Sequence, residues 1–290
     1  MNREPTHLNQ KVWRILDQRG HESALDAIDS FAMDDTLCAS VGGKLSPPTA
    51  RLWVHRDTVV LGIQDTRLPF IAEGLNYLEA KGYRVIVRNS GGLAVVLDEG
   101  VLNISLVMPV DRPFADIDDG FEAMRQLVEE LLHPYVRHIA VGEVEGSYCP
   151  GRYDLSIRGV KFAGISQRRT KGGMAVQVFL LVSGSGRRRA EVLKQFYQLA
   201  GAAQEPRGKL FPSINPETMA SLTELLSIGM NTDMLKQRLV EVLQNRSSRI
   251  ITTSRFPFEE ERFQLNRRRM VERNEKSLYK FDKIKREMPL

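Results

Sequence analysis

Cys149 is one of only two cysteines in the 290-residue chain, and it stands in the stretch GSYCPGRYD, residues 146–154. Glycine and proline around it predict an accessible loop, and Arg152 places a cation close by. A thiol with a pKa of about 8.5 is only a few per cent ionised at pH 7, and nearby positive charge raises the ionised fraction. Local sequence leaves a reactive thiol and a structural one equally open. Cys38 falls on the packed side of a predicted helix, which favours simple packing.

Lys161 starts the run KFAGISQRR, which alternates like a strand after the turn-prone Gly159. A lone lysine on a strand is usually solvated. If the fold brought Lys161 close to Cys149, it could favour the thiolate or polarise a carbonyl oxygen. Gly91 and Gly92 leave a similar choice, between a turn without a ligand and a place where the backbone approaches a substrate closely.

Other chemistries lack their usual signatures. None of the five histidines lies at metal-ligand spacing from a cysteine or another histidine, so we predict no metal site. The chain has no phosphate loop of the GxxxxGKS or GxxxxGKT type, and no GxGxxG run after a strand. We therefore expect no bound cofactor.

The composition is ordinary for a soluble globular protein, with 42% hydrophobic residues and a net charge of +5. The charged N-terminus does not resemble a signal peptide and no apolar run is long enough to span a membrane, so we expect a cytoplasmic protein with reduced thiols and no membrane partner.

Residues 246–290 hold thirteen Lys and Arg against seven Asp and Glu. Such a tail could bind nucleic acid, but its interspersed acidic residues favour a solvated helix, and we expect no nucleic-acid partner.

Apolar periodicity predicts an α/β (α+β) protein. Strand-like runs at 50–65, 84–109, 154–169 and 174–183 alternate with amphipathic helices at 24–42, 74–83, 117–136 and 183–201. Beyond Phe211 the strand pattern stops, and residues 214–244 predict two helices. We expect a catalytic domain over 30–245 and a helical or partly disordered tail over 246–290.

Several motifs occur in an order that resembles the biotin/lipoate protein ligase superfamily. The run RNSGGLAVVLDEGVLNISL, residues 88–106, matches its Arg-x-x-Gly-Gly and Asp-x-Gly-x-x-Asn patterns. DLSIRGVKFAGISQRR, residues 154–169, matches its hairpin with a functional lysine. The likeness covers roughly residues 30 to 210. It implies a mixed β-sheet flanked by helices, catalytic residues Cys149 and Lys161, and substrate-binding residues Arg88, Gly91, Gly92, Leu93, Asn103, Val160 and Gly164.

Two departures narrow the resemblance. Lipoate ligases usually carry a histidine where this chain has Leu97, and adenylate chemistry needs no thiol such as Cys149. The combination is similar to the subgroup of octanoyl-[glycine cleavage H protein]:protein N-octanoyltransferases.

That resemblance implies transfer of an octanoyl or lipoyl group, as a thioester on Cys149. The group would move from the lysine of octanoylated glycine cleavage H protein to apo lipoyl domains of 2-oxoacid dehydrogenase complexes. Lys161 would favour the thiolate and polarise the acyl carbonyl, with Leu93, Val95 and Val160 as walls of the acyl pocket, in a monomeric enzyme. An ATP-dependent lipoate or octanoate ligase, and a transferase from octanoyl acyl carrier protein to H protein, are the alternatives.

Overall fold

The computed structural model describes residues 7–20, 26–110, 117–205 and 210–287, with side chains as far as residue 278. Its centre is a mixed sheet in which β1 pairs in parallel with β11 and β2, while each later neighbour pairs antiparallel. The strand order across this sheet is β11 (Ser247–Thr252), β1 (Gln10–Gln18), β2 (Thr49–Trp53), β6 (Val101–Pro109), β10 (Gly173–Leu181), β9 (Val160–Thr170), β8 (Leu155–Ile157) and β7 (Ala140–Val141).

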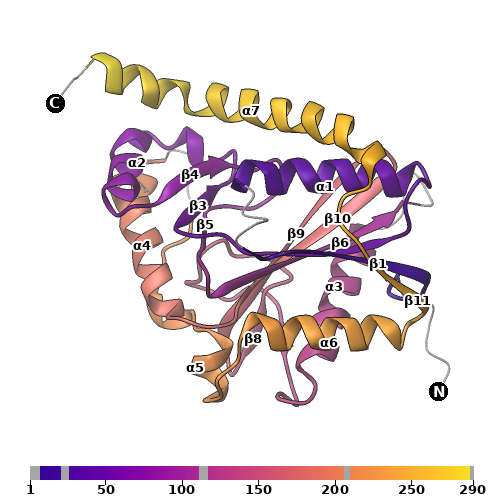
Figure 1. Cartoon of the computed structure of the whole chain (residues 1–290). Coiled ribbons are helices and arrows are strands. Elements are labelled where there is room, and N and C mark those ends of the chain that lie inside the picture. The colour runs from indigo at the N-terminus through magenta and orange to yellow at the C-terminus, as the bar shows by residue number, and fades with distance from the viewer. Residues whose placement is uncertain (1–6, 21–25, 111–116, 206–209, 288–290) are drawn as a thin grey trace.

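A smaller sheet lies beside the main one. Its order is β4 (Arg84–Val87), β3 (Thr58–Leu61) and β5 (Val95–Leu97). Helix α2 (Ile71–Ala80) and helix α4 (Gly186–Leu199) flank it and pack against each other (Figure 1). Short 3-10 turns complete this part of the fold at Asp65–Arg67, Ala202–Gln204 and Pro216–Thr218.

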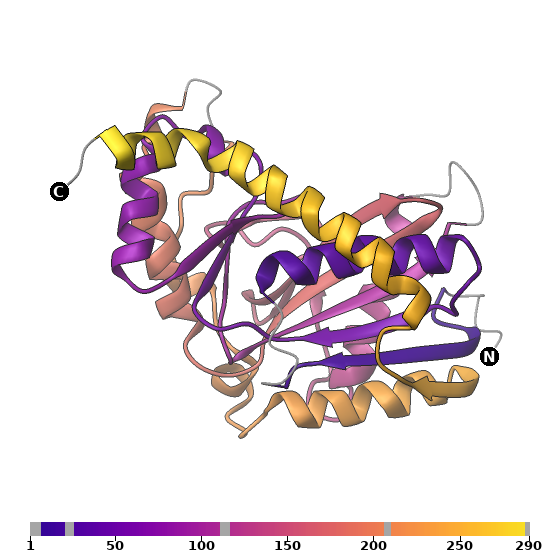
Figure 2. The same ribbon diagram turned by 45° about the horizontal axis from the view of Figure 1, so that its top comes forward.

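Helices cover both faces of the main sheet (Figures 1 and 2). Helix α1 (Ala27–Gly42) lies on one face and helix α7 (Glu260–Glu287) runs over it, following a 3-10 turn at Pro257–Glu259. Helices α3 (Ile117–Leu132) and α6 (Thr232–Gln244) lie on the other face, with the short α5 (Leu222–Leu226) before α6. The sheet therefore separates two hydrophobic cores, one shared with the small sheet and the other with α3 and α6.

The hairpin that carries Lys161 follows directly from local sequence. Arg158 and Gly159 join β8 to β9 with φ values of 52° and 79°, the left-handed pair that a two-residue hairpin turn requires. Gly159 adopts this conformation without a Cβ penalty. The turn sets Lys161 opposite Ser156, which fixes the strand position from which the lysine projects.

The expected mixed sheet flanked by helices is confirmed, but three strands were missed: β1, β11 and the two-residue β7. The N-terminal stretch is highly charged, yet residues 10–18 form β1, where Trp13 and Ile15 enter the core and Arg14 is buried as well. Beyond Phe211, where no strand was expected, Ser247–Thr252 forms β11 at the edge of the main sheet. An edge strand can keep polar side chains in solvent, and the short run SSRIIT lacks the apolar alternation that indicated the other strands.

The C-terminal segment is thus joined to the fold rather than peripheral to it. Phe263 and Met270 of α7 enter the core beside α1, and Asn266 donates to the hydroxyl of Thr36 at 3.1 Å. Its helical character from residue 260 onward agrees with the expectation from sequence. None of the described helices is both long enough and apolar enough to pass through a bilayer.

A buried ion pair ties β1 to the start of α7. Arg14 donates to both carboxylate oxygens of Glu259 at 2.8 and 2.9 Å, and both side chains are fully buried. Removing one member of a buried pair leaves an uncompensated charge, which typically costs about 3–5 kcal/mol.

We predict that Glu259→Gln lowers the free energy of unfolding by about 3 kcal/mol or more, because Arg14 loses its counter-charge in the interior. Chemical denaturation followed by circular dichroism measures this change. Glu260→Gln, one residue along on the exposed side, is the matched control and should change stability by less than about 1 kcal/mol. Equal stability of the wild type and Glu259→Gln would show that the pair does not hold the C-terminal segment in place.

Candidate active site

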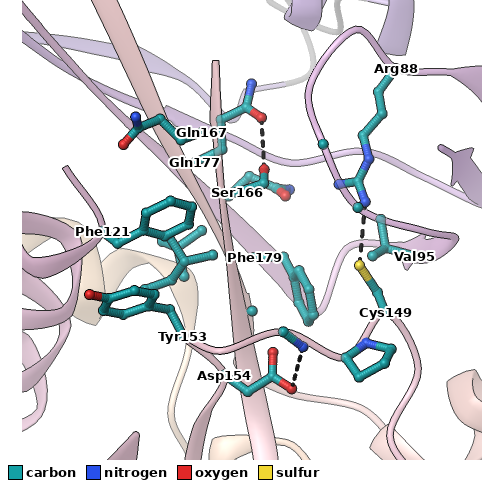
Figure 3. Close-up of a pocket in the computed structure, with 18 of the residues that line it drawn as sticks. Arg88, Val95, Phe121, Cys149, Tyr153, Asp154, Ser166, Gln167, Gln177 and Phe179 are labelled. Carbon is teal, nitrogen blue, oxygen red and sulfur yellow. Dashed lines mark hydrogen bonds between the residues drawn. The ribbon is translucent and has the colours of Figure 1, made fainter. Parts of the chain in front are cut away.

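Cys149 lies on the loop before β8 in a strained backbone conformation. Its φ is 45°, in the left-handed region that costs a non-glycine residue about 1–2 kcal/mol. The thiol is half-buried, and Sγ accepts from the backbone N–H of Leu93 at 3.2 Å and from Nη2 of Arg88 at 3.4 Å. Both donors bring positive charge close to the sulfur, which favours the thiolate, and Figure 3 shows the sulfur pointing toward Arg88. Strain of this kind, held by the surrounding structure, is common at functional sites.

Arg88 is 5% exposed and reaches the sulfur across the loop that contains Gly91 and Gly92. The same Nη2 also donates to the carbonyl of Leu93 at 2.6 Å, while Nε has no hydrogen-bond partner in the described part of the chain. At Gly92 a Cβ would lie 2.2 Å from Nη2 and 3.1 Å from Sγ, and its φ is 104°. Glycine is therefore required at 92 both for its backbone conformation and for the approach of arginine to thiol.

Lys161 is fully buried beneath the Cys149 loop, contrary to the solvated position that is usual for a strand lysine. Its Nζ donates to the carbonyls of Tyr148 and Cys149, each at 2.9 Å, and lies 2.9 Å from Oδ1 of Asp154. Nζ makes no described hydrogen bond to the sulfur. The ammonium thus holds the two carbonyls that flank the strained residue, and it acts on the loop rather than on the thiol directly.

Asp154 completes this arrangement. Its Oδ2 accepts from the N–H of Gly151 at 3.2 Å, which ties the carboxylate back to the Cys149 loop, and from the N–H of Val144 at 3.4 Å. Burial raises the pKa of Asp154, and the Lys161 ammonium opposes that rise. The carboxylate and the ammonium therefore neutralise each other inside the protein, where either one alone would be costly.

A cavity of about 310 Å³ opens beside the thiol, within the size range of small-molecule sites. Apolar side chains from α1, β2, β5 and β10 form much of its wall: Phe31, Trp53, Val95, Leu97 and Phe179. Phe121 and Tyr153 stack with ring centroids 4.8 Å apart, at the side of the pocket away from Cys149 (Figure 3). Polar groups from β9 and β10 close the remaining side, where Ser166 donates to Gln177 at 3.1 Å.

The structure brings most of the residues indicated by sequence to this cavity. Its lining includes Arg88, Gly91, Gly92, Val95, Asn103, Cys149 and Gly164. Gly164 lets the ring of Phe179 lie against β9, since a Cβ there would be 2.7 Å from that ring. Leu93 and Val160, expected as walls, do not line it: Leu93 contributes its backbone N–H, and Val160 lies at the hairpin turn. In the described residues no three His, Cys, Asp or Glu side chains gather as metal ligands.

Comparison with known proteins gives the family. Residues 26–244 match the family model described as the lipoyl protein ligase A/B catalytic domain. An octanoyl-[GcvH]:protein N-octanoyltransferase of Bacillus velezensis is 54% identical over 279 residues, which cover 95% of this chain and 97% of that protein. The chain belongs to the octanoyl-[GcvH]:protein N-octanoyltransferase family.

A relative whose name specifies a lipoyl rather than an octanoyl group is also similar to this chain. A lipoyl-[GcvH]:protein N-lipoyltransferase of Listeria monocytogenes is 45% identical over 278 residues, covering 96% of this chain and all of that protein. Among solved structures, lipoate-protein ligase A bound with ATP superposes with a TM-score of 0.66 at 19% identity, over 89% of this chain and 94% of that one. At that identity the superposition establishes the fold alone, and it confirms the ligase-like architecture expected from the motifs.

This member of the octanoyltransferase family also contains a buried pair that its motifs did not reveal. Asp65 is fully buried and accepts from the N–H of Gly62 at 2.7 Å and from the hydroxyl of Tyr197 at 2.9 Å. The Tyr197 oxygen in turn accepts from the N–H of Ala94 at 3.2 Å, next to the residue that contacts Sγ. Asp65 therefore supports the Gly92–Ala94 loop from behind. Only its place after the strand run VVLGIQ could have marked it in the sequence.

Helix α7 supports the same loop from another side, again without a sequence signal. Asn274 pairs with the backbone of Val87 as a neighbouring strand would: its Oδ1 accepts from Val87 N at 2.6 Å, and its Nδ2 donates to Val87 O at 3.1 Å. Arg273 donates to the carbonyl of Arg88 at 3.1 Å. The arginine that contacts the thiol is therefore positioned in part by the last described helix, outside the stretch that matches the catalytic-domain model.

Burial raises the pKa of Asp65 from 3.8 to about 7, against the favourable hydrogen bonds from Gly62, Tyr197 and Ala94 and the positive charge of Arg88. The folded protein thus binds this proton more tightly than the unfolded chain. The stabilisation from the protonated form is complete below the unfolded pKa of about 3.8 and is lost as pH rises toward about 7.

We predict that Asp65→Asn removes a fall in stability between about pH 5 and pH 7, with a slope of up to about 1.4 kcal/mol per pH unit. Urea denaturation of both proteins across this range measures the slope. Tyr197→Phe keeps the carboxyl group and serves as the control, which should retain the slope. Parallel pH profiles for wild type and Asp65→Asn would show that Asp65 does not titrate there.

Proposed function

We propose that this protein moves an octanoyl group between the lysines of two proteins by way of a thioester on Cys149. The donor is the glycine cleavage H protein, and the acceptors are lipoyl domains of 2-oxoacid dehydrogenases. The observation that carries the proposal is a strained, half-buried thiol that contacts Arg88 and the N–H of Leu93 at the end of an apolar cavity. The names of the high-identity relatives agree with this donor.

The first half-reaction exchanges an amide for a thioester. The sulfur of Cys149 attacks the carbonyl carbon of the octanoyl-lysine amide, and the carbon–nitrogen bond breaks. The thiol proton ends on the departing amine, so atoms and charge balance. In the second half-reaction the amine of the acceptor lysine attacks the thioester, and its proton returns to the sulfur. Covalent catalysis suits two large protein substrates, because one small site serves each of them in turn.

Arg88 is the cation best placed to act on the reacting atoms. Its Nη2 contacts the sulfur, and the residue lines the acyl cavity, so its guanidinium is a fixed cation near the oxygen that gains negative charge when the thiol attacks. A fixed donor of this kind stabilises a tetrahedral intermediate. The sequence had suggested Lys161 for this task, but the donors of that ammonium are committed to carbonyls and to Asp154. We assign Lys161 the task of positioning the nucleophile.

The apolar cavity beside the thiol holds the acyl chain. Burial of an eight-carbon chain at about 0.8 kcal/mol per methylene contributes on the order of 5 kcal/mol, enough to select acylated from free lysine. The relatives' names include both octanoyl and lipoyl transferases, so either cargo is compatible with this site. We further propose that the enzyme works as a monomer in the cytoplasm, without ATP.

We predict that Cys149→Ala abolishes transfer from octanoylated H protein to an apo lipoyl domain, because it removes the acyl carrier and leaves the fold intact. The assay is run in buffer free of ATP and treated with EDTA, where the wild type should reach its full rate. Gel mobility or mass of the acceptor domain reports the product.

Cys38→Ala is the control for loss of a thiol, since Cys38 is buried in the core and burial raises the pKa of its thiol well above the usual range. This variant should transfer almost normally. An active Cys149→Ala, or a strict need for ATP and magnesium in the wild type, would place the chain in the adenylate-forming class instead.

A further inference from the structure

A second hollow, which we call the basic groove, lies between α7 and the end of β9. Its volume is about 280 Å³, and its lining carries five cationic side chains and one carboxylate, that of Asp35. The cations come from two parts of the chain: Arg168 and Lys171 from the β9 end, and Arg262, Arg269 and Arg273 from α7. The groove is distinct from the acyl cavity, and the chemistry proposed above does not use it.

Positive charge in the basic groove is not balanced by the described residues around it. Arg168 already pairs with Asp35, and Asn89 donates to the same carboxylate at 3.0 Å. Within the described residues, no ion pair joins Lys171, Arg262 or Arg269 to a carboxylate. Burial lowers the pKa of Arg273, and the like charge of Arg168 lowers it further. The groove therefore has a strong unmet preference for negative charge.

The basic groove touches the back of the loop whose front faces the thiol. Arg168 donates to the carbonyl of Asn89 at 3.0 Å, and Arg273 donates to the carbonyl of Arg88 at 3.1 Å. Asn89 itself lines the groove, while Arg88 lines the acyl cavity. Only the loop of Arg88 and Asn89 separates the basic groove from Cys149. A protein substrate whose acyl-lysine reaches the thiol could therefore contact the groove with its surface.

We propose that the basic groove is a docking surface for an acidic face of the protein that carries the acyl-lysine. This inference rests on the proposed function, because it takes the substrate to be a protein that must sit across the loop beside the thiol. An arginine guanidinium can bind one carboxylate through two parallel hydrogen bonds, and opposite charge speeds the association of two proteins. Nucleic acid fits less well, since α7 also carries exposed glutamates, such as Glu272 and Glu275, that would repel phosphates.

The test reverses two groove charges in the full chain. Arg262→Glu combined with Arg269→Glu alters exposed side chains that make no described contact with the thiol or its loop. Association of octanoylated H protein, followed by stopped-flow or surface plasmon resonance at low ionic strength, should slow at least about tenfold. The remaining rate should depend less on salt than that of the wild type.

The matched control has the same change in net charge at exposed sites outside the groove, Arg268→Glu with Lys194→Glu. It should associate at close to the wild-type rate. Alkylation of Cys149 by iodoacetamide, a small reagent that needs no docking, should proceed equally in all three proteins. Because association is measured without any transfer step, docking can succeed or fail independently of the thioester chemistry.

Three results would overturn the proposal. Equal slowing in the groove and control variants would show that only net charge matters. Unchanged association in the groove variant would place the docking surface elsewhere. Tight binding of a DNA duplex that the groove variant loses, with association of H protein unaffected, would assign the groove to nucleic acid instead.

Discussion

A buried ammonium group holds the loop of Cys149, the proposed nucleophile, in place, and the rest of the candidate site depends on it. Lys161 has no exposed surface, and its Nζ contacts the carbonyls of Tyr148 and Cys149 and the carboxylate of Asp154. A charge in this position is tolerated only because oxygens surround it. The ammonium holds two consecutive carbonyls on one side of the loop. These contacts keep Cys149 in its strained left-handed conformation.

The environment of the Cys149 thiol is formed by two loops from distant parts of the chain. The loop of Arg88 and Gly92 comes from the small sheet, whereas Cys149 precedes β8 of the main sheet. The first loop is supported from behind by Asp65 through Tyr197, and from the side by Asn274 and Arg273 of α7. The C-terminal helix consequently helps to support the candidate site, although its composition suggested a solvated tail.

Much of the fold was predictable because its central strands and amphipathic helices have clear periodicity. Strand β10 is buried along its whole length and helix α3 has a single apolar face. Strands β1 and β11 could not be predicted in the same way, since their charged side chains are either paired in the interior, as Arg14 is with Glu259, or left in solvent at the edge. Pairing across 245 positions leaves no trace in local composition.

The candidate site shows the same division. Gly92 and Cys149 could be identified from sequence because a glycine pair and a lone cysteine in loops indicate a special backbone conformation or a reactive group. In the structure the two residues lie in close contact. The surroundings of Lys161 were not predictable, because the acceptors that bury it are main-chain carbonyls, which every residue carries. The same holds for Asn274, whose partner is the backbone of Val87. Sequence therefore identified the residues with distinctive chemistry, and the structure supplied the backbone contacts that position them.

The central claim is that Cys149 carries the acyl group, and mass spectrometry tests it most directly. The full chain is incubated with octanoylated H protein, then mapped by peptide mass with and without hydroxylamine, which cleaves thioesters but leaves amides intact. We predict one octanoyl adduct on the peptide that contains Cys149, and its complete loss after hydroxylamine. An adduct on Lys161 that resists hydroxylamine, or rapid transfer with no adduct on Cys149, would contradict the account.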